Sequence, residues 1–108
     1  MEQMRLDTCE PDVFEDLMEE CIFIYQQNIT KVQRWTMLGR REEQPAWNDL
    51  IFELRRSKDI AERLLAEYKG HDDHCVLREI LALVDRSVVG LARRIMDMED
   101  NMTIIGFM

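Results

Sequence analysis

Both histidines of the chain lie in one stretch, His71-Asp72-Asp73-His74-Cys75, together with two carboxylates and a thiol. These side chains are the ones that bind zinc and other transition metals. The sequence has no second cluster of such residues to complete a closed tetrahedral site, and the stretch has the composition of a turn before a helix. We therefore expect a solvated turn here, with no metal and no cofactor.

Covalent catalysis would need a cysteine or serine beside a positioned base. Cys75 next to His74 is the candidate pair, but adjacent residues of a helix point in different directions. The four glycines are isolated from one another, so the chain has no glycine-rich phosphate loop. These observations predict that the protein is not an enzyme.

A basic cluster offers a different chemistry, the binding of an anionic small molecule. Its members are Arg55, Arg56, Lys58, Arg63 and Arg94. Small all-helical enzymes can hold a dianion with such side chains when they face the interior of a bundle. The competing interpretation is a solvated face, in which Lys58 pairs with Glu62 and Arg63 pairs with Asp59, each four residues away. We favour the solvated face and keep a small helical enzyme or anion binder as the alternative function.

Three long amphipathic segments must position all of these groups. In the last segment the apolar residues follow steps of four and three without a break, the pattern of a helix packed against other helices. They are Leu77, Leu81, Val84, Val88, Leu91, Ile95, Met98 and Met102. The same steps run from Phe14 to Trp35, and again from Trp47 to Tyr68 with a polar gap around Ser57. We expect Trp35 and Trp47 to close one end of the core, and the gap to be solvated or to face a partner.

The turn residues set the bounds of these helices. Pro45 suits the first position of a helix, Gly39 and Gly70 suit C-caps, and Asp72 or Asp73 can cap the helix that follows. Connections this short join antiparallel neighbours. The sequence therefore predicts an all-α fold, an antiparallel bundle of three long helices at about 10–38, 45–69 and 74–100 in a single domain, residues 1–108.

The third predicted helix carries more apolar residues than one seam requires. The second set is Val76, Ile80, Leu83, Val89, Ala92 and Met96. Two apolar facets are typical of a central helix, or of a helix on which a second copy docks. Gly90 costs about 1 kcal/mol relative to alanine in a helix, so we expect another helix to approach closely there.

The end of the chain is apolar and rich in methionine, which suits either an adaptable binding surface or a packed C-terminus that closes the end of the bundle. We predict that a face of the third helix and the tail contact another protein and can support a homodimer. The predicted contact residues are Val89, Ala92, Met96, Met102, Ile104, Ile105 and Phe107.

The formal net charge is −8, and acidic side chains greatly outnumber basic ones in residues 1–30. We expect an acidic surface that steers a basic partner, or that mimics nucleic acid towards a nucleic-acid-binding protein. Its residues are Asp12, Glu15, Asp16, Glu19 and Glu20. Nucleic acid itself is an unfavourable partner for so acidic a chain, because affinity for it comes mainly from neutralising phosphates.

Composition also indicates the compartment. Three cysteines without a short pairing motif suit a reducing environment. The first residues do not resemble a signal peptide, and no apolar run approaches the roughly 20 residues that span a bilayer. We expect an intracellular protein without membrane contact. Its predicted function is that of a non-enzymatic helical interaction module, such as a small accessory, adaptor or inhibitor protein.

Overall fold

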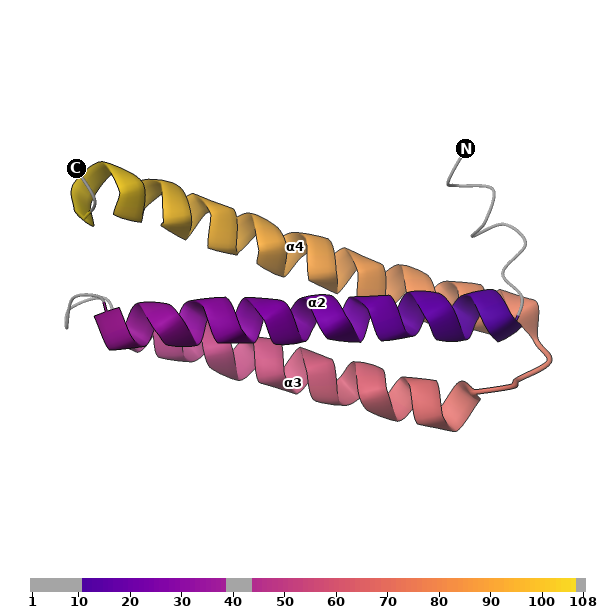
Figure 1. Ribbon diagram of the computed structural model, residues 1–108. Coiled ribbons are helices and arrows are strands. Elements are labelled where there is room, and N and C mark those ends of the chain that lie inside the picture. Colours follow the sequence, from indigo (N-terminus) through magenta and orange to yellow (C-terminus); the bar gives the residue numbers. More distant parts are fainter. Residues whose placement is uncertain (1–10, 39–43, 107–108) are drawn as a thin grey trace.

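The computed structural model describes residues 11–38 and 44–106, and the side chains of residues 13–38 and 44–100. The described residues form three helices: α2 (Pro11–Leu38), α3 (Gln44–Tyr68) and α4 (His74–Gly106). They build an all-α three-helix bundle (Figure 1), as predicted. Helix α4 runs past the predicted end at residue 100, because residues 101–105 include no proline or glycine that would stop it before Gly106.

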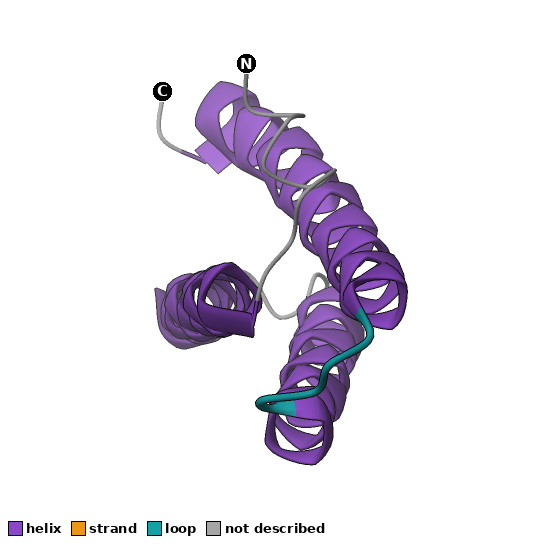
Figure 2. Ribbon diagram, turned by 90° about the vertical axis from the view of Figure 1, so that its right-hand side faces the viewer, coloured by secondary structure: helices purple, strands orange, loops and turns teal. Residues whose placement is uncertain are grey.

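The helices run up, down and up. Helices α2 and α4 point the same way, and α3 is antiparallel to both (Figure 1). Helix α2 contacts both neighbours extensively, whereas α3 and α4 contact each other least. Figure 2 shows α4 inclined away from the other two helices along its length. The central helix is therefore α2 and not α4. The interpretation that the third predicted helix carries two apolar sets because it is central is thus wrong.

The predicted seams form the core. Helix α2 contributes Phe14, Met18, Cys21, Tyr25, Ile29, Val32 and Trp35. Helix α3 contributes Trp47, Leu50, Ile51, Leu54 and Ala61. Helix α4 contributes Leu77, Ile80, Leu81, Val84, Val88, Leu91 and Ile95. Most members of each set follow one another at intervals of three or four residues because such positions share one face of a helix. Burying that face supplies most of the stability of the bundle.

The two tryptophans close one end of this core, as expected. Trp35 and Trp47 are both buried, and their ring centroids lie 6.1 Å apart at an interplanar angle of 58°. A tilted pair at this distance sets the positive edge of one ring against the electron-rich face of the other. The contact joins the end of α2 to the beginning of α3 across a connection that lies outside the described residues.

The α3–α4 connection shows how local residues fix a helix end. Gly70 has a positive φ of 76°, a conformation that costs other residues energy and that commonly ends helices. Asp73 then caps α4, because its Oδ1 accepts hydrogen bonds from the backbone N–H groups of Cys75 (3.0 Å) and Val76 (3.4 Å). The prediction that Asp72 or Asp73 caps this helix is confirmed for Asp73.

Gly90 does not meet the expectation placed on it. A Cβ atom added there would find nothing within 4 Å, apart from the neighbouring residues of its own helix. Among the residues that the structure describes, no other helix therefore comes within contact distance of Gly90, and the prediction of an intramolecular close contact is wrong. Helix α4 inclines away from α3 (Figure 2), and these two helices contact each other least.

Candidate functional site

The histidine-containing turn is built as a cap. The backbone N–H of Asp73 donates to Nδ1 of His71 at 3.1 Å, and the His71 ring packs on Tyr68 with centroids 5.4 Å apart. The Asp73 carboxylate is occupied by the first N–H groups of α4. Within residues 11–38 and 44–106, no three histidine, cysteine, aspartate or glutamate side chains are grouped so that they could hold a metal ion.

The basic cluster is only partly brought together. Arg55, Arg56 and Lys58 line an open groove of about 620 Å³ between α2 and α3. Asp59 and Glu62 line the same groove, so carboxylates offset much of its positive charge.

The ion pairs expected in this cluster are present. Lys58 Nζ lies 3.3 Å from Glu62, and Arg63 lies 3.6 Å from Asp59. Arg94 lines a second groove, between α3 and α4, which it shares with Arg56, and it pairs with Glu53. The structure therefore does not join the five predicted anion-binding residues into one site. Arg55 and Arg56 are the members for which the described residues provide no ion-pair partner.

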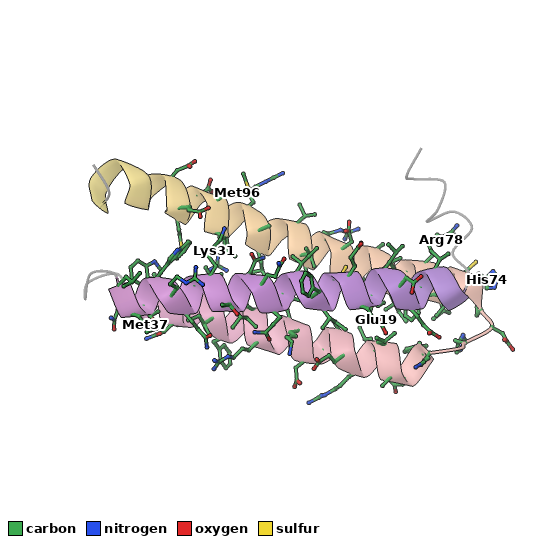
Figure 3. All side chains as sticks on the ribbon, in the orientation of Figure 1. Glu19, Lys31, Met37, His74, Arg78 and Met96 are labelled. Atoms are coloured by element: carbon green, nitrogen blue, oxygen red, sulfur yellow. The ribbon has the colours of Figure 1, made fainter. Side chains whose placement is uncertain are left out.

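The acidic residues do form a surface. Asp16, Glu19 and Glu20 are exposed on the outer face of α2, and Glu15 is half-buried at its edge (Glu19 is labelled in Figure 3). Asp12 belongs to α2, but its side chain lies outside the described residues. In the described part of the chain, Asp16, Glu19 and Glu20 pair with no cation. No described cation therefore offsets their charges.

Phe23 lies on the same face and was missed in the sequence. Its side chain is 59% exposed, although phenylalanine is among the residues most often found inside proteins. It follows Glu19 by four residues and Glu20 by three, so the three side chains are neighbours on the helix surface. We call Asp16, Glu19, Glu20 and Phe23 the acidic-Phe surface. The signal that could have revealed Phe23 is its position off the apolar seam and among acids.

The predicted contact residues of α4 are partly described. Val89 is 47% and Met96 is 62% exposed, and Ala92 is half-buried. Their exposure fits a contact surface. Met102, Ile104 and Ile105 belong to α4, but their side chains lie outside the described residues, and so does Phe107 as a whole.

The second apolar set of α4 is not one facet. Val76 and Ile80 pack towards the core, whereas Leu83 is 61% exposed. The six residues from Leu83 to Val89 turn a helix by about 600°, which places the two side chains about 240° apart around the axis. Leu83 therefore lies on a different flank of α4 from Val89 and Met96.

No protein-family model, curated protein or solved structure matches this chain. Its function must be inferred from its own residues. Within the described residues, no helix combines the length and the apolar character that crossing a membrane requires.

Polar groups in the middle of the bundle form hydrogen bonds between the helices. The Tyr25 hydroxyl donates to Ser87 Oγ at 2.8 Å, which links α2 to α4. Burial raises the pKa of Tyr25 above 10.0, while hydrogen bonds with the Ser87 and Ser57 hydroxyls act in the opposite direction. Ser57, in the polar gap of α3, thus faces this buried group. The polar gap of α3 was predicted to face solvent or a partner. At Ser57 it also faces the interior of the bundle.

Cys21 is unsuited to nucleophilic chemistry. Burial raises the pKa of its thiol from 9.0 to about 11, and the carboxylates of Asp85 and Glu20 add to the shift. The thiolate is the reactive form of cysteine, so this side chain is almost entirely inactive at neutral pH. It acts as a small apolar core residue.

The same pKa shift predicts a loss of stability in alkaline solution. Between pH 9 and about 11 the unfolded chain releases the Cys21 proton while the folded chain retains it. The unfolded state therefore binds fewer protons, and the free energy of unfolding falls as the pH rises through this range. The contribution is complete below pH 9 and is lost as the pH passes about 11. Urea unfolding followed by circular dichroism at several pH values measures the slope.

The matched control for this prediction is Cys21→Ala, which removes the titrating group. Its unfolding free energy should fall less steeply than that of the wild type over the same pH range. Equal slopes in the two proteins would show that the Cys21 thiol is not responsible.

Proposed function

We propose that this chain is a non-enzymatic helical interaction protein, an intracellular adaptor, accessory or inhibitor that binds another protein through the acidic-Phe surface of α2. The observation that carries the proposal is the exposed Phe23 beside Asp16, Glu19 and Glu20, which have no cation to pair with in the described part of the chain. Aromatic side chains dominate the energy of protein interfaces when they enter a pocket on the partner.

The charges identify the kind of partner. Exposed carboxylates attract a protein with a basic surface and speed its association, while the apolar anchor supplies most of the lasting affinity. We therefore expect a partner with arginine or lysine side chains around an apolar pocket. The two described cysteines, Cys21 and Cys75, are both unpaired, in keeping with a reducing compartment. Self-association through α4 is a second part of the proposal.

Affinity capture with matched variants tests the binding surface. Wild-type protein should retain a basic protein from host extract, and Phe23→Ala or Glu19→Lys combined with Glu20→Lys should not. The control is Phe52→Ala, which removes an equally exposed phenylalanine (65%) from α3. Retention should also weaken as salt rises, because salt screens the charges. A protein retained equally by the wild type and the Phe23→Ala variant would contradict this assignment.

Anion binding remains the second candidate. It is supported by Arg55 and Arg56, which line the groove between α2 and α3 without an ion pair in the described residues. The carboxylates of Asp59 and Glu62 in the same groove weaken it. A thermal-shift screen with inorganic phosphate and small dicarboxylates decides the matter, since a bound anion raises the melting temperature. No stabilisation by any of them would remove this candidate.

A further inference from the structure

An open groove separates α3 from α4. These helices contact each other least of the three pairs, and α4 inclines away from the bundle (Figures 1 and 2). The groove encloses about 510 Å³, and Ile60, Gly90 and Leu91 supply its apolar lining. Arg56 lies at its edge with the Arg94–Glu53 ion pair. An apolar groove with a charged rim has the form of a helix-binding site.

Gly90 is the most unusual member of this groove. It lies in the interior of α4, where glycine is the least favourable residue after proline. Nothing in the described chain makes use of the missing side chain, because the space above Gly90 is open. Leu83, two helical turns earlier and on the same flank of α4, is 61% exposed. One helix face thus displays an exposed leucine and, seven residues later, a position without a side chain and with open space above it.

We propose that the groove receives α4 of a second copy of the chain, running antiparallel, so that Leu83 of each copy packs over Gly90 of the other. This contact specifies the surface for the self-association that the proposed function includes. It is independent of the acidic-Phe surface, so either proposal can fail without the other.

The order of residues along α4 favours a second copy as the occupant. In an antiparallel pair related by a two-fold axis, a contact between Leu83 and Gly90 occurs twice. The axis then passes between Arg86 and Ser87. Glu79 lies four residues before Leu83 and Arg94 lies four residues after Gly90, so this register also brings Glu79 of each copy opposite Arg94 of the other.

The charges near the axis oppose the contact only in part. The two copies of Arg86 approach each other there as one like-charged pair, and Glu79 of each copy approaches Arg94 of the other, which already pairs with Glu53 of its own chain. All of these side chains are exposed, and exposed pairs contribute little individually. The removal of Leu83 and Ile60 from water is therefore the main driving force.

Sedimentation of the wild type and three variants tests the register. The wild type should form a dimer as its concentration rises from about 10 μM to about 1 mM. Leu83→Ala removes the exposed leucine and Gly90→Leu fills the space, so each should raise the dissociation constant about 10-fold or more. The double variant L83A/G90L exchanges large and small positions, and should return the dissociation constant to within about threefold of the wild type.

Two controls separate this contact from general damage. The Cβ atom of Gly90→Leu meets open space in the described chain and the substitution replaces a poor helix former, so circular dichroism should show an intact helix bundle. Ala66→Leu adds bulk at an exposed position of α3, about 120° around that helix from Ile60, and should leave the dimer unchanged.

Three results would overturn the proposal. The first is a wild type that stays monomeric at the highest concentration, which would leave the groove to a different occupant. The second is a dimer that Gly90→Leu does not weaken, or that is lost only when residues 103–108 are deleted. The third is a double variant that associates more weakly than either single variant.

Discussion

Alanine in place of Trp47 should lower the free energy of unfolding by about 3–5 kcal/mol. The Trp47 side chain is 2% exposed and packs against Trp35 at the end of the bundle where α2 gives way to α3. The substitution removes a large apolar area and leaves a cavity that the surrounding helices can fill only partly. Because domains are stable by about 5–15 kcal/mol in total, this loss is a large share of the stability.

Urea unfolding followed by circular dichroism measures this effect, and the fluorescence of Trp35 reports separately on the damaged end. The matched control is Asn48→Ala, the next residue of α3, which is exposed and should change stability by no more than about 0.5 kcal/mol. A loss below about 1 kcal/mol for Trp47→Ala would mean that the two tryptophans do not close the core.

Leu54→Ala and Phe52→Ala should differ sharply although the two residues are two positions apart in α3. Leu54 is fully buried, so its truncation should cost about 2–5 kcal/mol. Phe52 is 65% exposed, so its truncation should change the free energy of unfolding by no more than about 0.5 kcal/mol. Chemical unfolding of the two variants beside the wild type measures both values.

This pair tests the orientation of α3 directly. A helix rotated about its axis would exchange the environments of Leu54 and Phe52, since two residues turn a helix by about 200°. A Phe52→Ala variant less stable than Leu54→Ala would therefore contradict the packing described for this helix.

Most of the fold could be predicted from the spacing of the apolar residues. The step of three and four residues from Leu77 to Ile95 defines one face of a helix, and only packing against other helices can bury that face. Local signals were equally informative at the α3–α4 turn, where Gly70 and Asp73 have the conformation and the capping role predicted. These features depend on neighbours within a few residues, which a sequence displays.

The arrangement of the helices could not be predicted in the same way. Periodicity shows that a helix has a buried face, but not which neighbour covers it. The surplus of apolar residues in α4 suggested a central helix, whereas α2 takes that place and Leu83, Val89 and Met96 stay exposed. For the same reason the sequence could not show that no described helix of this chain approaches Gly90, because such an approach depends on the tilt of α4 relative to α3.

In the candidate sites, too, the features set by nearby residues were predicted, and the features set by the arrangement of the helices were not. The pairs Lys58–Glu62 and Asp59–Arg63 were predicted because their spacing of four residues is local to α3. Arg94 was grouped with them by charge alone, and it lies instead beside Glu53 in the groove between α3 and α4. Phe23 was missed because an exposed phenylalanine cannot be told from a buried one without knowing the face it occupies.

The most direct test of the proposed function is an NMR titration of the ¹⁵N-labelled chain with the protein that it captures. The account predicts that the largest changes in amide chemical shift fall around Asp16, Glu19, Glu20 and Phe23 on α2, and that the Phe23→Ala variant shows none of them. Changes concentrated around Arg55 and Arg56, with α2 unaffected, would contradict it.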